Sequence, residues 1–566
     1  MKILRIDMCA LTASLEYFPE AWTIVGGRGL TAKILSAEMP PDADPLGTDA
    51  RLVLATGPLS GTIAPSFGRM SIGAKSPLTF GIKESNVGGP LAQKLDKLEI
   101  RAVIIQGAPM GQELHVVKIS KDGVSFEDAD AYRGMGNYAL VEALHEKHGK
   151  LVSTMSVGVV GERKQKSASI ALTDKDGRPS RHAARGGLGA VMGAKGLKAI
   201  LVDDAGTSTV APLQKKVFQN ILSKWPELLA AEPSVQRMSK TGTPGILGTL
   251  TRIGSAPSKN YSGEPVEGVE DLFGENIEAE GKRRGGKMDA CMPGCLVKCS
   301  VIYHDSAGKH VTSSLEYETL ALMGANLGVA DPDAVARFDR KCDDLGVDSI
   351  EIGSALGVAA SVGKFAMGDV VAVNAILEEI EQGGELGMTI ADGVVNTAKS
   401  LGVERVPAFK GQAMPAHDPR VGKPTGVTYH TSPMGADHTA GLKYEMDDAS
   451  AVEQSLREQI LNATLDSLGL CQFAVTEDRK VLMSFVRDLL NACYELDVTQ
   501  DDIIDIGRET LRTELAFNKR AEFSSMHGPA PEFVRAEAAP RMGATFGVDQ
   551  GEIDSIWDGL DTISVI

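Results

Sequence analysis

The chain has few cysteines, few aromatic residues and no long hydrophobic run. Seven of its 566 residues are cysteine, and aromatic residues make up 5%. So few cysteines in so long a chain argue against the disulfide framework of small secreted proteins. No run of about eighteen apolar residues occurs, so no membrane-spanning helix is expected. The start lacks a signal-peptide core and twin arginines, which favours a cytoplasmic protein.

The chain also has fewer basic residues than acidic ones. Lysine and arginine total 58 against 75 acidic residues, giving a net charge of -17. Nucleic acid is therefore not an expected partner, because phosphate binding needs the opposite sign. The length and the 43% hydrophobic content indicate a large protein of about two to four domains with substantial cores.

The periodicity of the chain predicts an α+β fold with a sheet-rich N-terminal part. Short β-type runs separated by glycine and proline turns fill the first part of the chain, and helical spacing dominates after it. The runs lie at residues 51–55, 70–74, 102–106, 114–119 and 199–202, and the alternating start at residues 1–7 is interpreted as an edge strand. The change to helical spacing after residue 205 marks one boundary, and a break at residues 411–426 marks another. Together they predict a sheet domain over 1–205 and two mainly helical domains over 206–410 and 411–566.

Four cysteines form the most informative pattern. Cys291, Cys295 and Cys299 are each separated by three residues, and Cys471 lies far downstream. Three closely spaced thiolates with one remote thiolate are typical ligands of an iron-sulfur cluster. The same run is also compatible with zinc or with no metal. Electron chemistry is the leading hypothesis.

A pattern around an aspartate and a glycine occurs twice. Asp343 precedes Gly346, and Asp466 precedes Gly469, in each case after a stripe of apolar residues with helical spacing. Each glycine is expected just beyond the end of its helix. Each aspartate then lies in the last turn, where the helix dipole disfavours a carboxylate. A hydrogen-bond donor from a bound ligand would compensate it, although an ordinary solvated helix end is the alternative.

Asp348 also has a local interpretation. It follows Gly346 and precedes the next helical stretch, where an aspartate is a common N-cap. Glu351 is then expected to complete a capping box with it.

Further motifs in a fixed order resemble the aldehyde ferredoxin oxidoreductase family over nearly the full length. They are Gly26-Gly-Arg-Gly-Leu30, Ala55-Thr-Gly-Pro-Leu-Ser-Gly61, Gly68-Arg69, Lys75-Ser-Pro-Leu-Thr79, Ser85-Asn-Val-Gly-Gly89, Arg185-Gly-Gly-Leu-Gly, Glu316-Tyr-Glu-Thr-Leu320, Gly324-Ala-Asn-Leu-Gly328, His417-Asp-Pro-Arg420 and Gly435-Ala-Asp-His438. The family's usual first cysteine gap is two residues, whereas it is three here.

The resemblance implies a tungsten or molybdenum ion held by two pterins, a [4Fe-4S] cluster, and magnesium between the pterin phosphates. Cys291, Cys295, Cys299 and Cys471 would bind the cluster, while Glu318 and His438 would be catalytic. The residues at the phosphate-binding positions are Arg69, Asn86, Gly88, Arg181, His182 and Ala184, and Arg185 is a further phosphate donor. Those that would hold the pterin rings are Asp343, Val347, Asp348, Asp466 and Leu470. His182 and Ala184 depart from the family's small-residue pattern.

The implied activity is oxidation of an aldehyde to its carboxylic acid, with electrons passed to a ferredoxin-like carrier. A low-potential reductase subunit of a larger, aryl-CoA reductase-like complex is the second hypothesis. A non-catalytic electron-transfer module is the third, and the presence of both Glu318 and His438 argues against it. The resemblance is also compatible with a homodimer.

Overall fold

The N-terminal part of the chain contains a six-stranded mixed sheet in the order β2-β1-β6-β3-β4-β5. The computed structural model describes residues 1–523 and 529–566. The strands are β1 Lys2–Asp7, β2 Thr12–Tyr17, β3 Leu52–Thr56, β4 Met70–Lys75, β5 Ile82–Val87 and β6 Ile100–Gln106.

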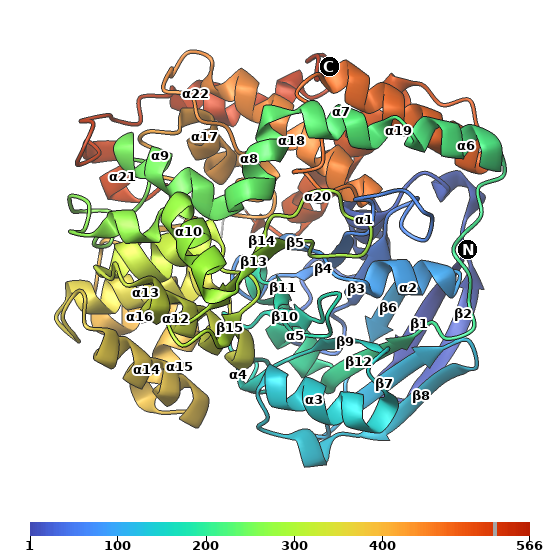
Figure 1. Cartoon of the computed structure of the whole chain (residues 1–566), viewed down its shortest axis with the longest axis horizontal. Coiled ribbons are helices and arrows are strands. Elements are labelled where there is room, and N and C mark those ends of the chain that lie inside the picture. Colours follow the sequence, from blue (N-terminus) through green and yellow to red (C-terminus); the bar gives the residue numbers. More distant parts are fainter. Residues whose placement is uncertain (524–528) are drawn as a thin grey trace.

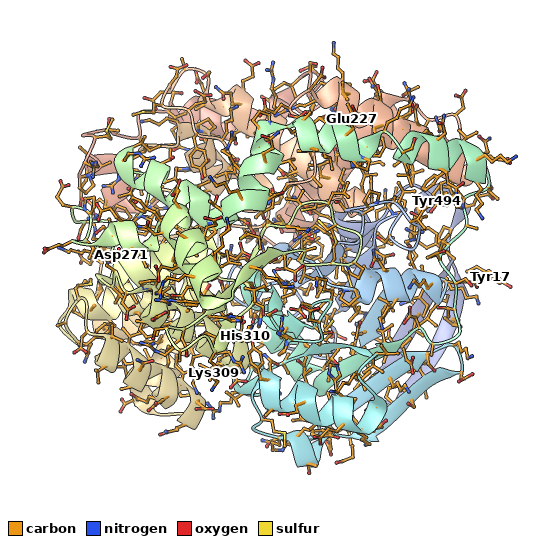
Figure 2. The ribbon with its side chains drawn as sticks, viewed as in Figure 1. Tyr17, Glu227, Asp271, Lys309, His310 and Tyr494 are labelled. Carbon is orange, nitrogen blue, oxygen red and sulfur yellow. The ribbon has the colours of Figure 1, made fainter. Side chains whose placement is uncertain are left out.

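The prediction of β1 as an edge strand is wrong. β1 pairs in parallel with β6 and antiparallel with β2. The edge is β2, which is exposed along its whole length, and its last residue, Tyr17, is 92% exposed (Figure 2). Alternation of apolar and polar residues shows which face of a strand is buried, but it does not show how many neighbours the strand has.

A second six-stranded sheet follows in the order β11-β10-β9-β12-β7-β8. Its strands are β7 His115–Ser120, β8 Gly123–Asp128, β9 Ser153–Ser156, β10 Ile170–Leu172, β11 Arg181–Ala183 and β12 Leu197–Asp203. All five predicted runs coincide with strands of the two sheets, namely β3, β4, β6, β7 and β12. Their β-branched and aliphatic residues are buried on both faces of the sheet, as expected of inner strands.

The two sheets share one apolar core. Leu54 and Ile72 of the first sheet belong to the same buried cluster as Val117 and Ile200 of the second. The helices of this part are α1 Gly27–Glu38, α2 Leu91–Lys97, α3 Asn137–His148, α4 Val159–Glu162 and α5 Leu188–Ala194. Residues of α2 and α5 join this core, whereas α1 joins a second cluster together with Phe517 of the C-terminal helix α20.

The middle of the chain is mainly helical, as predicted (Figure 1). Its helices are α6 Lys215–Leu222, α7 Trp225–Ala231, α8 Pro233–Thr241, α9 Leu247–Arg252, α10 Gly274–Arg284, α11 Tyr317–Thr319, α12 Pro332–Leu345, α13 Ser349–Ser361, α14 Val370–Gln382, α15 Glu385–Ala391 and α16 Val394–Leu401. A small sheet of β13 Lys287–Asp289, β14 Ser300–His304 and β15 His310–Thr312 interrupts them. The cysteine run connects β13 to β14, so the antiparallel pairing of these strands brings its two ends together.

The C-terminal part packs against both preceding parts. It contains the short strands β16 Ala408–Phe409 and β17 Gln412–Ala413, then α17 Lys423–Thr431, α18 Ala451–Leu468, α19 Arg479–Tyr494, α20 Gln500–Arg520, α21 Glu532–Ala536 and α22 Gln550–Asp554. Helices α18 and α20 both contact α1, which ties the C-terminal helices to the first sheet (Figure 1). None of the helices in the described residues is long and apolar enough to cross a membrane. The fold is α+β.

Candidate active site

A carboxylate between two imidazoles lies where the middle and C-terminal parts meet. Glu318 is on the short helix α11, and its Oε1 lies 3.0 Å from His417 Nε2 and 3.6 Å from His438 Nε2. The backbone N–H of Ala416 donates to Glu318 Oε2 at 2.8 Å. His438 begins a 3-10 turn whose N-cap is Asp437. The two sequence-predicted catalytic residues are therefore neighbours in space.

The electrostatics keep Glu318 ionised. Burial raises the pKa of this carboxyl, but His438, His417 and the Ala416 N–H together lower it to about 2. Burial lowers the pKa of His438 to about 4. Near neutral pH the site therefore holds a carboxylate and a neutral imidazole. His438 Nδ1 is buried and has no hydrogen-bond partner among the described residues, so it is available to a ligand.

His417 is a site residue that the sequence interpretation missed. In the sequence it is one member of a motif, yet its ring is nearer to Glu318 than that of His438. Its Nδ1 lies 2.9 Å from the hydroxyl of Tyr444. No local signal identifies it, because His417 and Glu318 are about a hundred residues apart and meet only through the fold.

The four predicted cluster ligands converge from two segments. Cys291, Cys295 and Cys299 come from the β13–β14 connection, and Cys471 follows the end of α18. All four are free thiols, and they belong to or pack against the same buried cluster of apolar residues. The backbone N–H of Cys471 donates to the carbonyl of Ser66, whose hydroxyl lies 3.6 Å from Cys295 Sγ. Ser66 therefore contacts both the remote Cys471 and Cys295 of the closely spaced run.

The charges around these thiols favour a thiolate at one position. A hydrogen bond from Cys295, with the charges of Arg181 and Arg69, lowers the pKa of Cys291 to about 6 against the effect of burial. The same hydrogen bond, together with burial, raises the pKa of Cys295. Burial also raises the pKa of Cys471. A positively charged metal centre would stabilise all of these groups as thiolates.

The four thiols are not gathered into one compact set of ligands. In the part of the chain that the structure describes, the one group of three or more potential ligands within 4.8 Å of one another is Glu318, His417 and His438. Sulfurs around one zinc ion, at about 2.3 Å each, cannot be more than about 4.6 Å apart. The four cysteines do not form such a group, although Cys291 and Cys295 are within hydrogen-bond reach of each other.

Two buried arginines lie near the site: Arg181 is close to Cys291, and Arg185 is close to Glu318. Arg181 donates to the carbonyl of Ser313 at 2.7 Å, and Arg185 donates to the carbonyls of Ala413 and Ala436. Arg181 Nε, Arg185 Nε and Arg185 NH1 are buried and find no hydrogen-bond partner within the described ranges. Fixed guanidinium groups with free donors are well suited to an anionic ligand.

The other predicted phosphate-binding residues surround this region. Arg69 Nε donates to Asn86 Oδ1. Burial would lower the pKa of Arg69, but its electrostatic interactions with Cys471, Cys291 and Asp466 raise it. A Cβ on Gly88 would lie 2.9 Å from Cys291 Sγ, so this position needs glycine. Ala184 lies between β11 and the turn that begins at Arg185.

The first predicted pterin-binding aspartate ends α12 as expected. Gly346 follows the helix with φ +72°, and Val347 continues into a bridge with Ala168 of the sheet domain. The Asp343 carboxylate accepts a hydrogen bond from the Tyr138 hydroxyl at 3.2 Å and lies 3.1 Å from His182 Nε2. The structure thus places His182 against the aspartate.

Asp348 is an N-cap, but the predicted capping box is wrong. Asp348 accepts from the backbone N–H of Ile350, and its Oδ2 lies 3.4 Å from Arg185 Nε. Glu351 instead accepts from the N–H groups of Val394 and Ala413. Because these donors come from other parts of the fold, burial with tertiary partners has replaced the local contact.

The second aspartate has a different partner. Asp466 ends α18, where Gly469 has φ +65° and Leu470 is buried. Its Oδ2 lies 3.6 Å from Arg28 NH1, and Arg28 also makes a bidentate pair with Glu514 at 2.9 and 2.8 Å. Burial raises the pKa of Asp466 to about 6 despite Arg28. Both predicted helix ends are confirmed, whereas the ligand contacts of these residues stay predictions.

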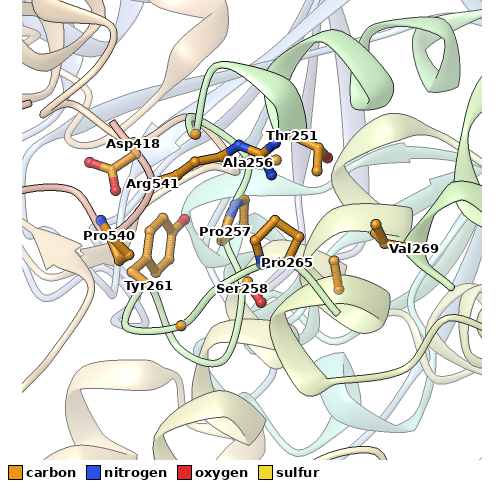
Figure 3. Close-up of a pocket in the computed structure, with 13 residues that line it drawn as sticks. Thr251, Ala256, Pro257, Ser258, Tyr261, Pro265, Val269, Asp418, Pro540 and Arg541 are labelled. Carbon is orange, nitrogen blue, oxygen red and sulfur yellow. The ribbon is translucent and has the colours of Figure 1, made fainter. Parts of the chain in front are cut away.

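The lining of two cavities does not include Glu318, His417 or His438. A cavity of about 30 Å³ beside Tyr261 and Asp418 is large enough for water only (Figure 3). A larger hollow of about 1170 Å³ is lined by residues that include Phe409, His430 and Trp557. His430 stacks on Phe546 there, and its Nδ1 contacts the carbonyl of Gly426, so its surroundings are those of a packing residue.

Comparison with known proteins identifies the family of the chain. The chain matches the family models "Aldehyde ferredoxin oxidoreductase, N-terminal domain" over residues 3–204 and "Aldehyde ferredoxin oxidoreductase, domains 2 & 3" over residues 220–555. It is 29% identical over 556 residues to the tungsten-containing aldehyde ferredoxin oxidoreductase of Pyrococcus furiosus, covering 92% of this chain and 88% of the relative. The Pyrococcus abyssi protein of the same name is 30% identical over 558 residues, with the same two coverages.

More distant likenesses exist. An aliphatic sulfonate oxidoreductase, WOR-like subunit, from Pyrococcus furiosus is 28% identical over 503 residues, or 81% of this chain and 76% of the relative. The solved active site complex BamBC of benzoyl coenzyme A reductase has the same fold, with a TM-score of 0.81 at 16% identity over 99% of this chain and 93% of the other. Because the two family models together span most of its length, the chain belongs to the aldehyde ferredoxin oxidoreductase family.

Proposed function

We propose that this protein oxidises an aldehyde to its carboxylic acid with a tungsten or molybdenum bis-pterin and one [4Fe-4S] cluster. The observation that carries the proposal is the buried Glu318 carboxylate, held beside two imidazoles and close to arginines with free donors. Relatives named for tungsten and for aldehydes support the same assignment.

The residues present fit the proposed groups. Arg69, Arg181 and Arg185 would hold pterin phosphates, with magnesium between them, and Asp343 and Asp466 would each accept hydrogen bonds from one pterin. The sulfurs of Cys291, Cys295, Cys299 and Cys471 would hold the cluster. When bound, the metal would take two electrons from the substrate and the cluster would pass them singly to a ferredoxin-like carrier.

The chain's own residues handle the proton. Oxidation of an aldehyde with water to an acid releases two electrons and two protons. The Glu318 carboxylate is ionised at neutral pH and takes one of these protons, from the attacking water or the substrate hydroxyl. The neutral His438 ring, with Nδ1 free, orients the substrate oxygen. The surrounding tyrosines and apolar side chains exclude bulk water.

A low-potential reductase subunit is the second candidate. It is favoured by the shared fold with a complex whose title names benzoyl coenzyme A reductase. That likeness covers nearly the whole chain, but the identity is 16%, against 29% and 30% for the relatives named for aldehydes. Turnover of an aldehyde, rather than of an aromatic acyl thioester, distinguishes the two.

The test is elemental analysis of anaerobically purified protein, followed by an aldehyde screen with a viologen acceptor. About one tungsten or molybdenum and about four iron atoms per chain are expected. The variant Cys471→Ser should lose iron. The matched variant Cys493→Ser, which removes a buried thiol of the same apolar cluster, should keep it. Zinc alone in the wild type, or full iron in Cys471→Ser, would contradict the cluster assignment.

A further inference from the structure

Glu318, His417 and His438 together present the donor atoms of a metal site. Each residue offers one oxygen or nitrogen, and these atoms lie within 4.8 Å of one another, which holds for no other such group in the described ranges. Two imidazoles and one carboxylate are a common ligand set of zinc and of other divalent transition metals. Magnesium and calcium instead prefer oxygen ligands. The residue types therefore favour a cation like zinc.

The separations of the donor atoms also suit one ion. Ligand atoms about 2.1 Å from a metal are about 3.4 Å apart in a tetrahedral site, and adjacent ones are about 3.0 Å apart in an octahedral site. Glu318 Oε1 lies 3.0 Å from His417 Nε2 and 3.6 Å from His438 Nε2. The carboxylate oxygen is thus at a ligand-to-ligand distance from both rings.

The contact between Glu318 and His417 is short without being a hydrogen bond. Oε1 lies 3.0 Å from Nε2, yet it is buried and has no hydrogen-bond partner in the part of the chain that the structure describes. An unpaired oxygen of a buried carboxylate is unfavourable. A bound cation would remove this penalty, because the lone pairs of the oxygen and of the ring nitrogens would then point toward the ion.

Neighbouring groups hold two of the three side chains in position. The backbone N–H of Ala416 donates to Glu318 Oε2 at 2.8 Å, which leaves Oε1 for an ion. His417 Nδ1 lies 2.9 Å from the Tyr444 hydroxyl, which leaves Nε2 for the same ion. Hydrogen bonds of this kind orient the ligands of a metal and fix the tautomer of a ligating histidine.

We propose that Glu318, His417 and His438 bind a divalent transition-metal cation such as zinc, and that this cation inhibits the enzyme. The inhibition rests on the function proposed above, in which the Glu318 carboxylate takes a proton. Since Oε2 is bonded to Ala416, Oε1 is the oxygen available both to that proton and to the cation. The two uses exclude each other, so a bound cation stops turnover until it leaves. The side chains of Glu318 and His438 are 13% and 19% exposed, which allows the ion to enter.

The experiment adds zinc to the metal-loaded enzyme and measures both zinc binding and turnover. Equilibrium dialysis should give about one zinc per chain, with iron and tungsten or molybdenum retained, and viologen reduction should fall in proportion to the zinc bound. A chelator should restore the rate, and magnesium at the same concentration should not inhibit. X-ray absorption at the zinc edge should show nitrogen and oxygen neighbours at about 2.0–2.2 Å and no sulfur, which excludes the cysteines.

Two variants test which residues hold the ion. His417→Gln removes one ligand, and its zinc affinity should fall at least about tenfold. Tyr444→Phe keeps all three ligands but removes the hydroxyl beside His417 Nδ1, so its affinity should fall about tenfold. The matched control is His430→Phe, which removes a histidine that stacks on Phe546 outside this group, and it should bind zinc as the wild type does.

The outcomes separate this site from the proposed function. No bound zinc, zinc with sulfur neighbours, zinc that displaces tungsten or molybdenum, or wild-type affinity in both variants would overturn the site. Zinc bound at these residues with full turnover would overturn the inhibition. If the metal-loaded wild type oxidises no aldehyde, the proposed function fails, while dialysis and the zinc-edge spectrum still decide whether these three residues bind the cation.

Discussion

Replacing Glu318 with glutamine separates its proton chemistry from its structural role. Glutamine has nearly the same shape, and its carbonyl oxygen can still accept the N–H of Ala416. What is lost is the carboxylate that lies between His417 and His438. Glu318→Gln should therefore fold and bind the same cofactor metals as the wild type, but should lack the proton acceptor.

The expected loss of rate is large. General base catalysis by a positioned side chain contributes about 10²- to 10⁴-fold, which corresponds to about 2.7–5.4 kcal/mol of activation free energy. Turnover should fall within that range, as measured by viologen reduction at saturating aldehyde and expressed per bound metal. Glu162→Gln is a matched control, because it removes a partly buried carboxylate that pairs with Lys198 in the sheet domain. It should keep the turnover of the wild type.

The same variant has a smaller effect on stability. Its surroundings lower the pKa of Glu318 from 4.5 to about 2, which corresponds to at most about 3 kcal/mol. Because the folded pKa is the lower one, this contribution is present above pH 4.5 and is lost as the pH falls toward 2. Glu318→Gln should thus be less stable than the wild type at pH 7, with a difference that shrinks in acid.

Turnover of Glu318→Gln within threefold of wild type, with full metal content, would refute the role of Glu318 as the base.

Two further predictions concern the fold itself. In Gly57→Ala the new Cβ would lie 2.2 Å from the carbonyl oxygen of Leu468, so unfolding measurements should show a loss of about 1–3 kcal/mol, whereas Gly281→Ala meets nothing within 4 Å and should not be destabilising. Burial lowers the pKa of His430 to about 4, so its contribution to stability is present above pH 6.5 and is lost as the pH falls from 6.5 toward 4. Between pH 7 and pH 4, denaturant unfolding of the wild type should lose about 3 kcal/mol more stability than His430→Phe does. Equal losses would contradict the assignment.

Local features of the chain were predictable because their causes are local. The helix ends at Gly346 and Gly469 follow from the need for a left-handed residue after the last turn, and glycine meets that need in both places. The buried strands follow from runs of β-branched and aliphatic residues that only an inner strand can bury. The cysteine pattern, too, indicates a metal centre, since thiolates at that spacing have few other uses.

Other features depend on segments that meet only in the folded chain. Arg28 pairs with Glu514 across almost the whole sequence, and together they place a fixed positive charge beside Asp466. His182 lies against Asp343 because β11 passes the end of α12. Neither pairing leaves a periodic or spaced signal in the sequence, so neither could be predicted from it.

The sequence by itself determined the α+β class, the strands and helix ends, the cysteines, and Glu318 and His438 as candidate catalytic residues. Only the tertiary structure decided that β1 is an inner strand, that Glu351 turns away from Asp348, and that His417 lies nearer to Glu318 than His438 does. The physical reason is the range of the interactions. Propensity, capping and spacing act within a few residues, whereas hydrogen bonds and charges in a buried site join whichever segments the packing of the core brings together.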